Sequence, residues 1–199
     1  MTLGSAARVL GAIVFAAAAT ACGGGGGGSN DGGTTGGPQT GTFVAADSTP
    51  PADTVSLQAG TQSGLVVNVL VRATDVDDFF GAGFRVLYDA TVAQYQTFDA
   101  SASFLRDAPF DTAGAPLQFQ VDSSTPGVLS ISATRLQNLD GNATGVNVAG
   151  TRTLLSLQFV MLKVTQQSPV TLPASQREAR NSADAVLPLN WQAGAFQVF

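Results

Sequence analysis

Hydrophobic side chains recur at every second residue along most of this chain from Val55 onward. In each of the clearest runs, an apolar set alternates with a polar or mixed set: residues 65–72, 117–122, 129–134 and 155–162. Because successive side chains of a β-strand point to opposite faces, this period of two predicts strands that bury one face. Helical periodicity is weak throughout, so an all-β domain is the fold class that the chain can form.

Turn-forming residues separate these runs. Clusters rich in glycine, proline, aspartate and asparagine occur at residues 60–64, 75–83, 109–116, 123–127 and 138–150. Short alternating strands divided by such clusters are typical of an antiparallel sandwich, and we predict a jelly-roll or immunoglobulin-like β-sandwich of about nine strands. The last run, residues 193–199, is expected to dock into a sheet as the final strand.

The N-terminal region has the pattern of an export signal. An apolar, alanine-rich run at residues 9–21 follows a single basic residue, Arg8. The run is shorter than the roughly 20 residues of a transmembrane helix and has the length of a signal-peptide core. It ends in Ala19-Thr20-Ala21, directly before Cys22. We therefore predict a signal peptide at residues 1–21.

Cys22 makes the segment similar to bacterial lipoprotein signals, in which small residues precede a cysteine that is lipidated. The resemblance implies lipid attachment at Cys22 and a location in the cell envelope, at the outer membrane or cell surface. Ordinary cleavage after Ala21, leaving a free thiol, is the alternative. Six consecutive glycines follow the cysteine, and such a composition cannot bury enough surface to fold. We predict a disordered tether over residues 22–52 and a sandwich over residues 53–199.

The residue inventory excludes several classes of function. The chain has no histidine, one cysteine, one lysine (Lys163) and one glutamate (Glu178). Ser-His-Asp and Cys-His sites and a histidine-ligated zinc are therefore impossible. A net charge of −5 with scattered basic residues gives no footprint for nucleic acid. We predict a monomeric protein that is not an enzyme and that meets the membrane only through its N-terminal lipid.

Three aspartates form the one cluster that could hold a metal. Asp75, Asp77 and Asp78 lie in the predicted turn at residues 75–83. Carboxylate oxygens from one loop suit Ca²⁺, so these residues are weak calcium candidates. The alternative is that they accept hydrogen bonds from backbone N–H groups of the turn. No other metal or cofactor is expected.

The adjacent Phe79 and Phe80 are candidates for a contact surface. A strand could bury only one of them, so the other could stack on a sugar or touch a partner. Alternatively, the loop folds back and both rings close the end of the sandwich. Trp191, Tyr88 and Tyr95 are expected in core or corner positions.

The segment from Val69 to Asp89 reads VLVRATDVDDFFGAGFRVLYD, and a later segment from Gly150 reads GTRTLLSLQF. This arrangement resembles the cohesin module and, more broadly, the carbohydrate-binding-like superfamily; Ala90 departs from the proline usual after Tyr-Asp. The resemblance implies a nine-stranded jelly roll with a non-catalytic docking role, whose cellulosomal partner is a calcium-loaded dockerin. A carbohydrate-binding module for polysaccharide and a structural or assembly lipoprotein remain as alternatives. The binding residues are not predicted.

Overall fold

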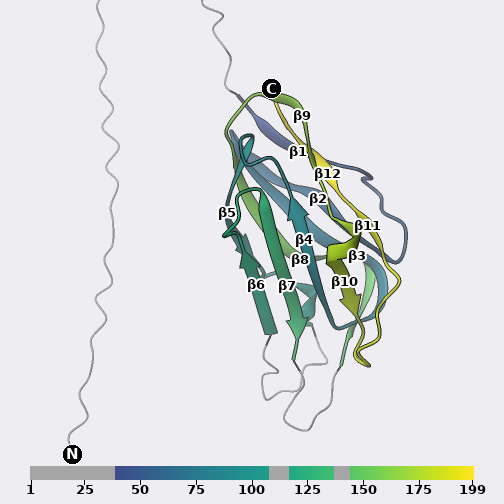
Figure 1. The fold of residues 1–199 in the computed structure, drawn as a ribbon. Coiled ribbons are helices and arrows are strands. Elements are labelled where there is room, and N and C mark those ends of the chain that lie inside the picture. Colours follow the sequence, from purple (N-terminus) through teal and green to yellow (C-terminus); the bar gives the residue numbers. More distant parts are fainter. Residues whose placement is uncertain (1–38, 108–116, 137–143) are drawn as a thin grey trace, which may run out of the picture. The chain divides into compact units, whose positions relative to one another are not determined.

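The computed structural model describes residues 39–107, 117–136 and 144–199. These residues form strands and two short 3₁₀ turns (Figure 1). No helix within the described ranges is long and apolar enough to cross a membrane. The strands are β1 Gly41–Ala45, β2 Thr54–Ser63, β3 Val66–Phe79, β4 Gly81–Leu87, β5 Ala93–Asp99, β6 Leu117–Asp122, β7 Val128–Arg135, β8 Val146–Met161, β9 Thr165–Val170, β10 Arg177–Arg180, β11 Asn190–Gln192 and β12 Gly194–Val198. The 3₁₀ turns are η1 Phe104–Arg106 and η2 Ala174–Gln176.

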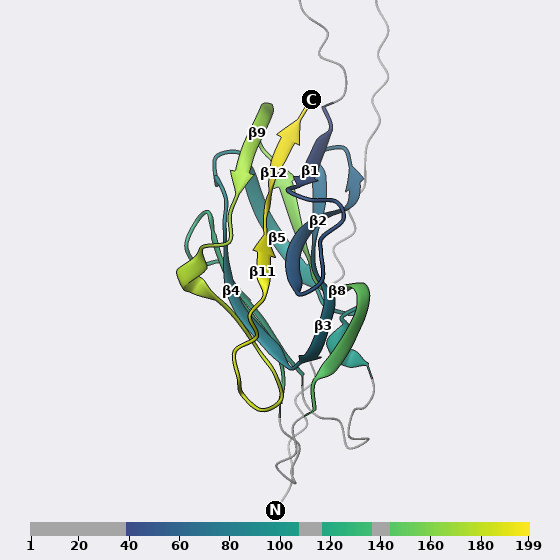
Figure 2. The same cartoon turned by 90° about the vertical axis from the view of Figure 1, so that its right-hand side faces the viewer.

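Two sheets face each other across the core. One has four strands in the order β10-β4-β7-β6, and the other has five in the order β11-β2-β3-β8-β5. The four-stranded sheet lies toward the viewer in Figure 1, and Figure 2 shows the two layers from the side, with β11 and β12 between them. A third sheet has three strands in the order β1-β12-β9. The predicted all-β sandwich is confirmed.

The alternating pattern places the core as expected. Val67, Val69 and Val71 of β3 are buried, and so are Ile131 of β7 and Phe159 of β8. Their neighbours in sequence face outward, as the burial patterns of β7 and β8 show. The apolar faces predicted from sequence are therefore the faces that pack together.

The number of strands and the start of the domain differ from prediction. The described residues contain twelve strands rather than about nine. β1 lies inside the segment predicted to be tether (22–52), pairs antiparallel with β12, and buries Phe43. Five residues are too few to show a clear alternation of apolar and polar side chains, and they directly follow a glycine-rich stretch. β11 is also unexpected, because it pairs parallel with β2.

Other sequence-based predictions fall outside the described residues. These are the signal peptide at residues 1–21, lipid attachment at Cys22, the tether as far as residue 38, and the turn at residues 109–116. They stay predictions.

One buried guanidinium connects loops at the end of the core. Arg135, the last residue of β7, is 2% exposed. Its Nε donates to the carbonyl oxygen of Leu105 at 3.0 Å and its Nη1 to that of Thr144 at 3.0 Å. Burial lowers the pKa of Arg135, and the negative charge of Asp107 acts in the opposite direction. Arg135 thus satisfies carbonyl groups of η1 and of the chain entering β8, which have no strand partner.

Four exposed turns share the sequence pattern Asp-x-Ser/Thr. In each, a carboxylate oxygen accepts a hydrogen bond from the backbone N–H two residues later, which is the geometry of an Asx turn. The distances are 2.8–2.9 Å: Asp47 accepts from Thr49, Asp89 from Thr91, Asp99 from Ser101 and Asp122 from Ser124. This local pattern ends strands and needs no tertiary contact to form.

These turns predict a loss of stability in acid. Hydrogen bonds from Thr91, Ser101 and Ser124 lower the pKa of Asp89, Asp99 and Asp122 below the ordinary 3.8. Since the folded-state pKa is depressed, the stabilisation is present above the unfolded-state pKa and is lost as pH falls below it through the folded-state values. We expect urea midpoints to fall below about pH 4. Replacing the three aspartates by asparagine, which keeps the acceptor oxygen, should flatten that fall; equal slopes would contradict this assignment.

Candidate functional site

The outward side of the β10-β4-β7-β6 sheet carries two adjoining hollows. Strand alternation and register place one row from each strand on it, and we call this surface the four-stranded face. Its rows are Glu178 and Arg180 from β10, Gly81, Gly83 and Arg85 from β4, Ser130, Ser132 and Thr134 from β7, and Gln118, Gln120 and Asp122 from β6.

Side-chain size makes this face a groove. The two central strands carry mostly glycine, serine and threonine, whereas the two edge strands carry longer side chains. Two hollows result, one of about 490 Å³ against Arg85, Gln120 and Asp122, and one of about 280 Å³ against Gly83 and Glu178. Both include Ser132, so they adjoin along the sheet. A flat polar sheet would have no such relief.

Two glycines in β4 have different reasons to be there. A Cβ added at Gly81 would lie 2.4 Å from Oγ1 of Thr134, so the cross-strand threonine requires glycine at this position. A Cβ at Gly83 would meet nothing within 4 Å. The space above Gly83 is therefore open, and a partner can approach the backbone of the central strand there.

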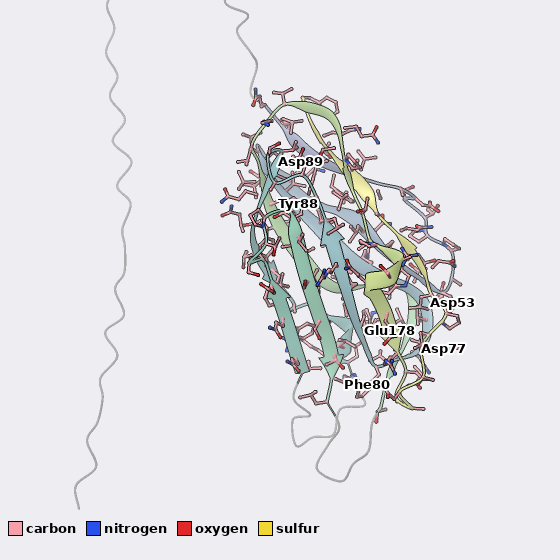
Figure 3. All side chains as sticks on the ribbon, in the orientation of Figure 1. Asp53, Asp77, Phe80, Tyr88, Asp89 and Glu178 are labelled. Atoms are coloured by element: carbon pink, nitrogen blue, oxygen red, sulfur yellow. The ribbon has the colours of Figure 1, made fainter. Side chains whose placement is uncertain are left out.

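Charges of both signs border the groove. On β10, Nε of Arg180 lies 2.5 Å from Oε1 of Glu178, and its Nη1 lies 3.0 Å from Oδ1 of Asp184. Glu178 is labelled at this border in Figure 3. Near the other border, Asp122 accepts hydrogen bonds from Ser124 that lower its pKa, and the charge of Arg85 contributes in the same direction. The charged side chains along the borders favour a polar partner over an apolar one.

The groups on this face are suited to binding. They are hydroxyls, amides, guanidinium groups and carboxylates, with accessible backbone in the centre. Within the part of the chain that the structure describes, no three His, Cys, Asp or Glu residues gather closely enough to hold a metal ion.

The predicted calcium candidates lie elsewhere, and two of them have separate hydrogen-bond partners. Asp75 and Asp78 are inside β3 rather than in a turn between strands, at bulges with φ of 45° and 51°. Aspartate tolerates this left-handed conformation better than most residues. Oδ1 of Asp75 accepts from the N–H of Gly150 at 2.6 Å, and Oδ2 of Asp78 accepts from Oγ of Ser182 at 2.8 Å.

Asp77 is exposed between them (Figure 3). The sequence-based placement of the cluster in a turn was therefore wrong, because β3 continues through the bulges. Asp75 and Asp78 do accept hydrogen bonds from backbone N–H groups, as in the alternative, but the donors, Gly150 and Ser182, are distant in the sequence and do not belong to a turn around the aspartates.

This arrangement predicts that calcium does not stabilise the protein. We expect the melting temperature to be the same with millimolar calcium and with a chelator, because the carboxylates of Asp75 and Asp78 have separate partners. Differential scanning calorimetry of wild type and Asp77→Asn tests this, since Asp77 is exposed and the loss of its charge should change nothing. A calcium-dependent rise that Asp77→Asn abolishes would restore the calcium site.

The two adjacent phenylalanines have different environments. Phe79 is fully buried and packs edge-on against Phe104, with ring centroids 5.2 Å apart. Phe80 is half-buried and lines the smaller hollow at the end of the four-stranded face (Figure 3). The prediction that one ring is available for contact therefore fits Phe80.

The other aromatic residues pack inward, as predicted. Trp191 lies 5.5 Å from the ring of Phe84, and Tyr88 and Tyr95 lie 5.2 and 5.9 Å from that of Phe159. Their contacts are tilted or edge-on. Three rings committed to the core in this way do not form a coplanar sugar platform.

Sequence reasoning missed the groove residues Gly83, Ser130 and Ser132. The alternation did place the two serines on the polar side of their strand. It could not distinguish a polar side that meets water from one that meets a partner, because that depends on which strands become neighbours.

Among known proteins, this chain is similar to solved structures only. No protein-family model matches the chain, and no curated protein matches it significantly. Solved structures do match. A cohesin from Clostridium acetobutylicum superposes with a TM-score of 0.55 at 21% identity, over 73% of this chain and 90% of its own.

Two further cohesins match at lower identity. A type II cohesin from the cellulosome of Acetivibrio cellulolyticus gives a TM-score of 0.50 at 15% identity, over 80% of this chain and 95% of its own. A type I cohesin–dockerin complex from Clostridium thermocellum gives 0.51 at 11% identity, over 71% and 96%. At these identities the likeness concerns the backbone arrangement. The described part of the chain therefore has the cohesin fold.

Proposed function

We propose that this protein is a non-catalytic docking module that binds a partner protein on its four-stranded face. The observation that carries the proposal is the groove over β4 and β7, with small side chains in its centre and ionised ones at its borders. A polar, solvent-accessible rim around the central contact area is the usual arrangement of a protein–protein interface.

The dimensions of the face favour a helical partner. The axes of four strands spaced about 4.8 Å apart span roughly 14 Å, and the seven residues of β4 extend roughly 24 Å. A helix is about 10–12 Å across with its side chains, so one helix fits along the groove and leaves both borders in contact. The solved cohesin–dockerin complex of the same fold supports a dockerin-type partner.

Filling the groove should abolish binding without unfolding the protein. In Gly83→Arg the new side chain occupies open space, because no atom lies within 4 Å of its Cβ. We expect the affinity for a dockerin module, measured by calorimetry, to fall by at least roughly 30-fold, which corresponds to about 2 kcal/mol. The melting temperature should stay within the range of a neutral surface substitution.

The matched control is Ser63→Arg, which adds the same side chain at an exposed position of the five-stranded sheet. It should bind like wild type. Equal loss in both variants, or in neither, would place the binding surface elsewhere. Binding to insoluble polysaccharide but to no dockerin would favour the carbohydrate-binding alternative.

We further propose that the module is anchored to the cell envelope by a lipid on Cys22. The support is the short apolar run before Ala19-Thr20-Ala21-Cys22 and the fact that the chain has no other cysteine with which Cys22 could pair. Metabolic labelling with a fatty-acid probe should mark the wild type and not Cys22→Ser. An unlabelled wild type would leave simple secretion as the explanation of the signal.

A further inference from the structure

One end of the sandwich carries the most exposed apolar side chain of the described residues together with two others. Phe199 is 69% exposed, Val164 60% and Leu162 50%. Lys163, the only lysine of the chain, stands between the last two and is also exposed. We call these four residues the apolar end. Large apolar side chains grouped at one place on a small domain indicate a contact surface.

Hydrogen bonds place this group where the chain enters the domain. Thr40 and Phe199 exchange two backbone hydrogen bonds, of 3.0 and 3.1 Å. The N–H of Met161 donates to the carbonyl of Leu65 at 2.9 Å, and the N–H of Gly41 donates to that of Gly64 at 2.8 Å. In Figures 1 and 2 the start of β1 and the C-terminal end of β12 lie at the same extremity. The segment leading back to Cys22 therefore joins the domain at the apolar end.

We propose that the apolar end rests in the surface of the lipid bilayer to which Cys22 is anchored. This inference rests on the proposed lipidation. Leu162, Val164 and Phe199 would enter the boundary between headgroups and acyl chains. Lys163 would keep its ammonium group at headgroup level while its methylene stem lies among the apolar side chains.

The length of the connection makes so small a contact sufficient. Sixteen residues separate Cys22 from Gln39. For a glycine-rich composition the expected reach is about 22 Å. A lipid anchor over that distance keeps the apolar end at a high effective concentration near the bilayer, so a contact too weak to recruit a free domain can still orient a tethered one.

The contact is expected to be apolar rather than electrostatic. Hydrogen bonds from Thr91 lower the pKa of Asp89, and the nearby charge of Lys163 acts in the same direction. Asp89 is labelled toward this end of the domain in Figure 3. A single lysine with a carboxylate nearby gives little attraction to anionic lipid. Contact should therefore depend weakly on the fraction of anionic phospholipid.

Such a contact has a consequence for docking. The antiparallel strands of the four-stranded face lie along the long direction of the sandwich, which has the C-terminus at one end (Figure 1). With the apolar end on the bilayer, this face stands roughly upright and is open sideways. A tumbling domain would turn its groove toward the lipid for part of the time.

Depth-dependent quenching on the lipidated full-length chain tests the proposal. Val164→Cys and, as matched control, Val186→Cys would each carry an environment-sensitive fluorophore. Val186 is a comparably exposed valine (55%) that bridges Arg180 of β10, away from the apolar end. In phosphatidylcholine vesicles with nitroxide-labelled lipids, we expect a blue shift and several-fold stronger quenching at position 164 than at 186. Adding Leu162→Gln and Phe199→Gln should remove the difference.

The outcomes are distinguishable. Vesicle-bound protein with equal quenching at both positions would overturn the proposal while leaving the lipid anchor intact. A chain that does not associate with vesicles and lacks the Cys22 acyl mass would instead refute the anchor. A blue shift in detergent that grows with protein concentration would show that a second copy of the chain covers the apolar end, and this too would overturn the proposal.

Discussion

Replacing Phe159 by alanine is expected to lower the free energy of unfolding by about 3–5 kcal/mol, the range for deleting a buried aromatic ring. Phe159 in β8 is fully buried, and its ring packs against those of Tyr88, Tyr95 and Phe196, with centroids 5.0–5.9 Å apart. It therefore joins the five-stranded sheet to the end of β4 and to β12. Few single substitutions would remove contacts with as many elements.

The effect should be large relative to the whole stability. A domain of this size is stable by about 5–15 kcal/mol, so the variant is expected to unfold at a much lower urea concentration with an unchanged slope. Phe199→Ala is the control, because that ring is 69% exposed and its loss should cost less than about 0.5 kcal/mol. A loss below 1 kcal/mol in Phe159→Ala would mean that the buried and exposed faces of β8 are wrongly assigned.

Removing β1 should be more damaging still. A chain that begins at Asp53, where the sequence suggests that the domain starts, lacks the five residues that pair with β12. One of these five residues is Phe43, which is 2% exposed and packs edge-on against Phe196 with ring centroids 5.6 Å apart. Deleting one such ring costs about 3–5 kcal/mol before the strand pairing is counted. The shortened chain would also expose the edge of β12.

We therefore expect the chain from Asp53 to lose its cooperative unfolding transition or to aggregate. A chain that begins at Gly36 should unfold like the full-length protein, since it retains β1 with residues before it. Circular dichroism and calorimetry on the two chains decide the question. A shortened chain with the melting temperature of the longer one would show that β1 is dispensable and that the sequence-based boundary is the functional one.

The sequence predicts the central strands well because their burial is one-sided. In β6 and in residues 129–134 of β7 the polar and apolar residues alternate without interruption, and the observed bounds match the predicted runs to within a residue or two. Such a pattern admits one register, since a slip of one residue would expose the whole apolar row. The all-β class follows from these strands alone.

Other elements depend on contacts distant in sequence. β1 is recognisable only through β12, at the opposite end of the chain. β3 passes through Asp75 and Asp78 because Gly150 and Ser182 supply hydrogen bonds to their carboxylates, whereas locally these aspartates are typical of a turn. The glycine at position 145 also depends on a distant contact, because a Cβ there would lie 2.1 Å from Oδ1 of Asp78. Local patterns carry no information on these partners.

The groove is hidden from the sequence for a related reason. Gly83, Ser130 and Ser132 are unremarkable turn or strand residues until β4 and β7 become neighbours and β6 and β10 border them. The resemblance to cohesins predicts docking but no residue for it. The arrangement of the strands in the four-stranded sheet indicates where on the domain docking would occur.

Hydrogen exchange on the complex with a dockerin module tests the central claim most directly. Binding to the four-stranded face should slow amide exchange in Gly81–Leu87 and Val128–Arg135, with little change in Val66–Phe79 of the opposite sheet. Protection confined to the five-stranded sheet, or no complex with any dockerin module, would contradict the account.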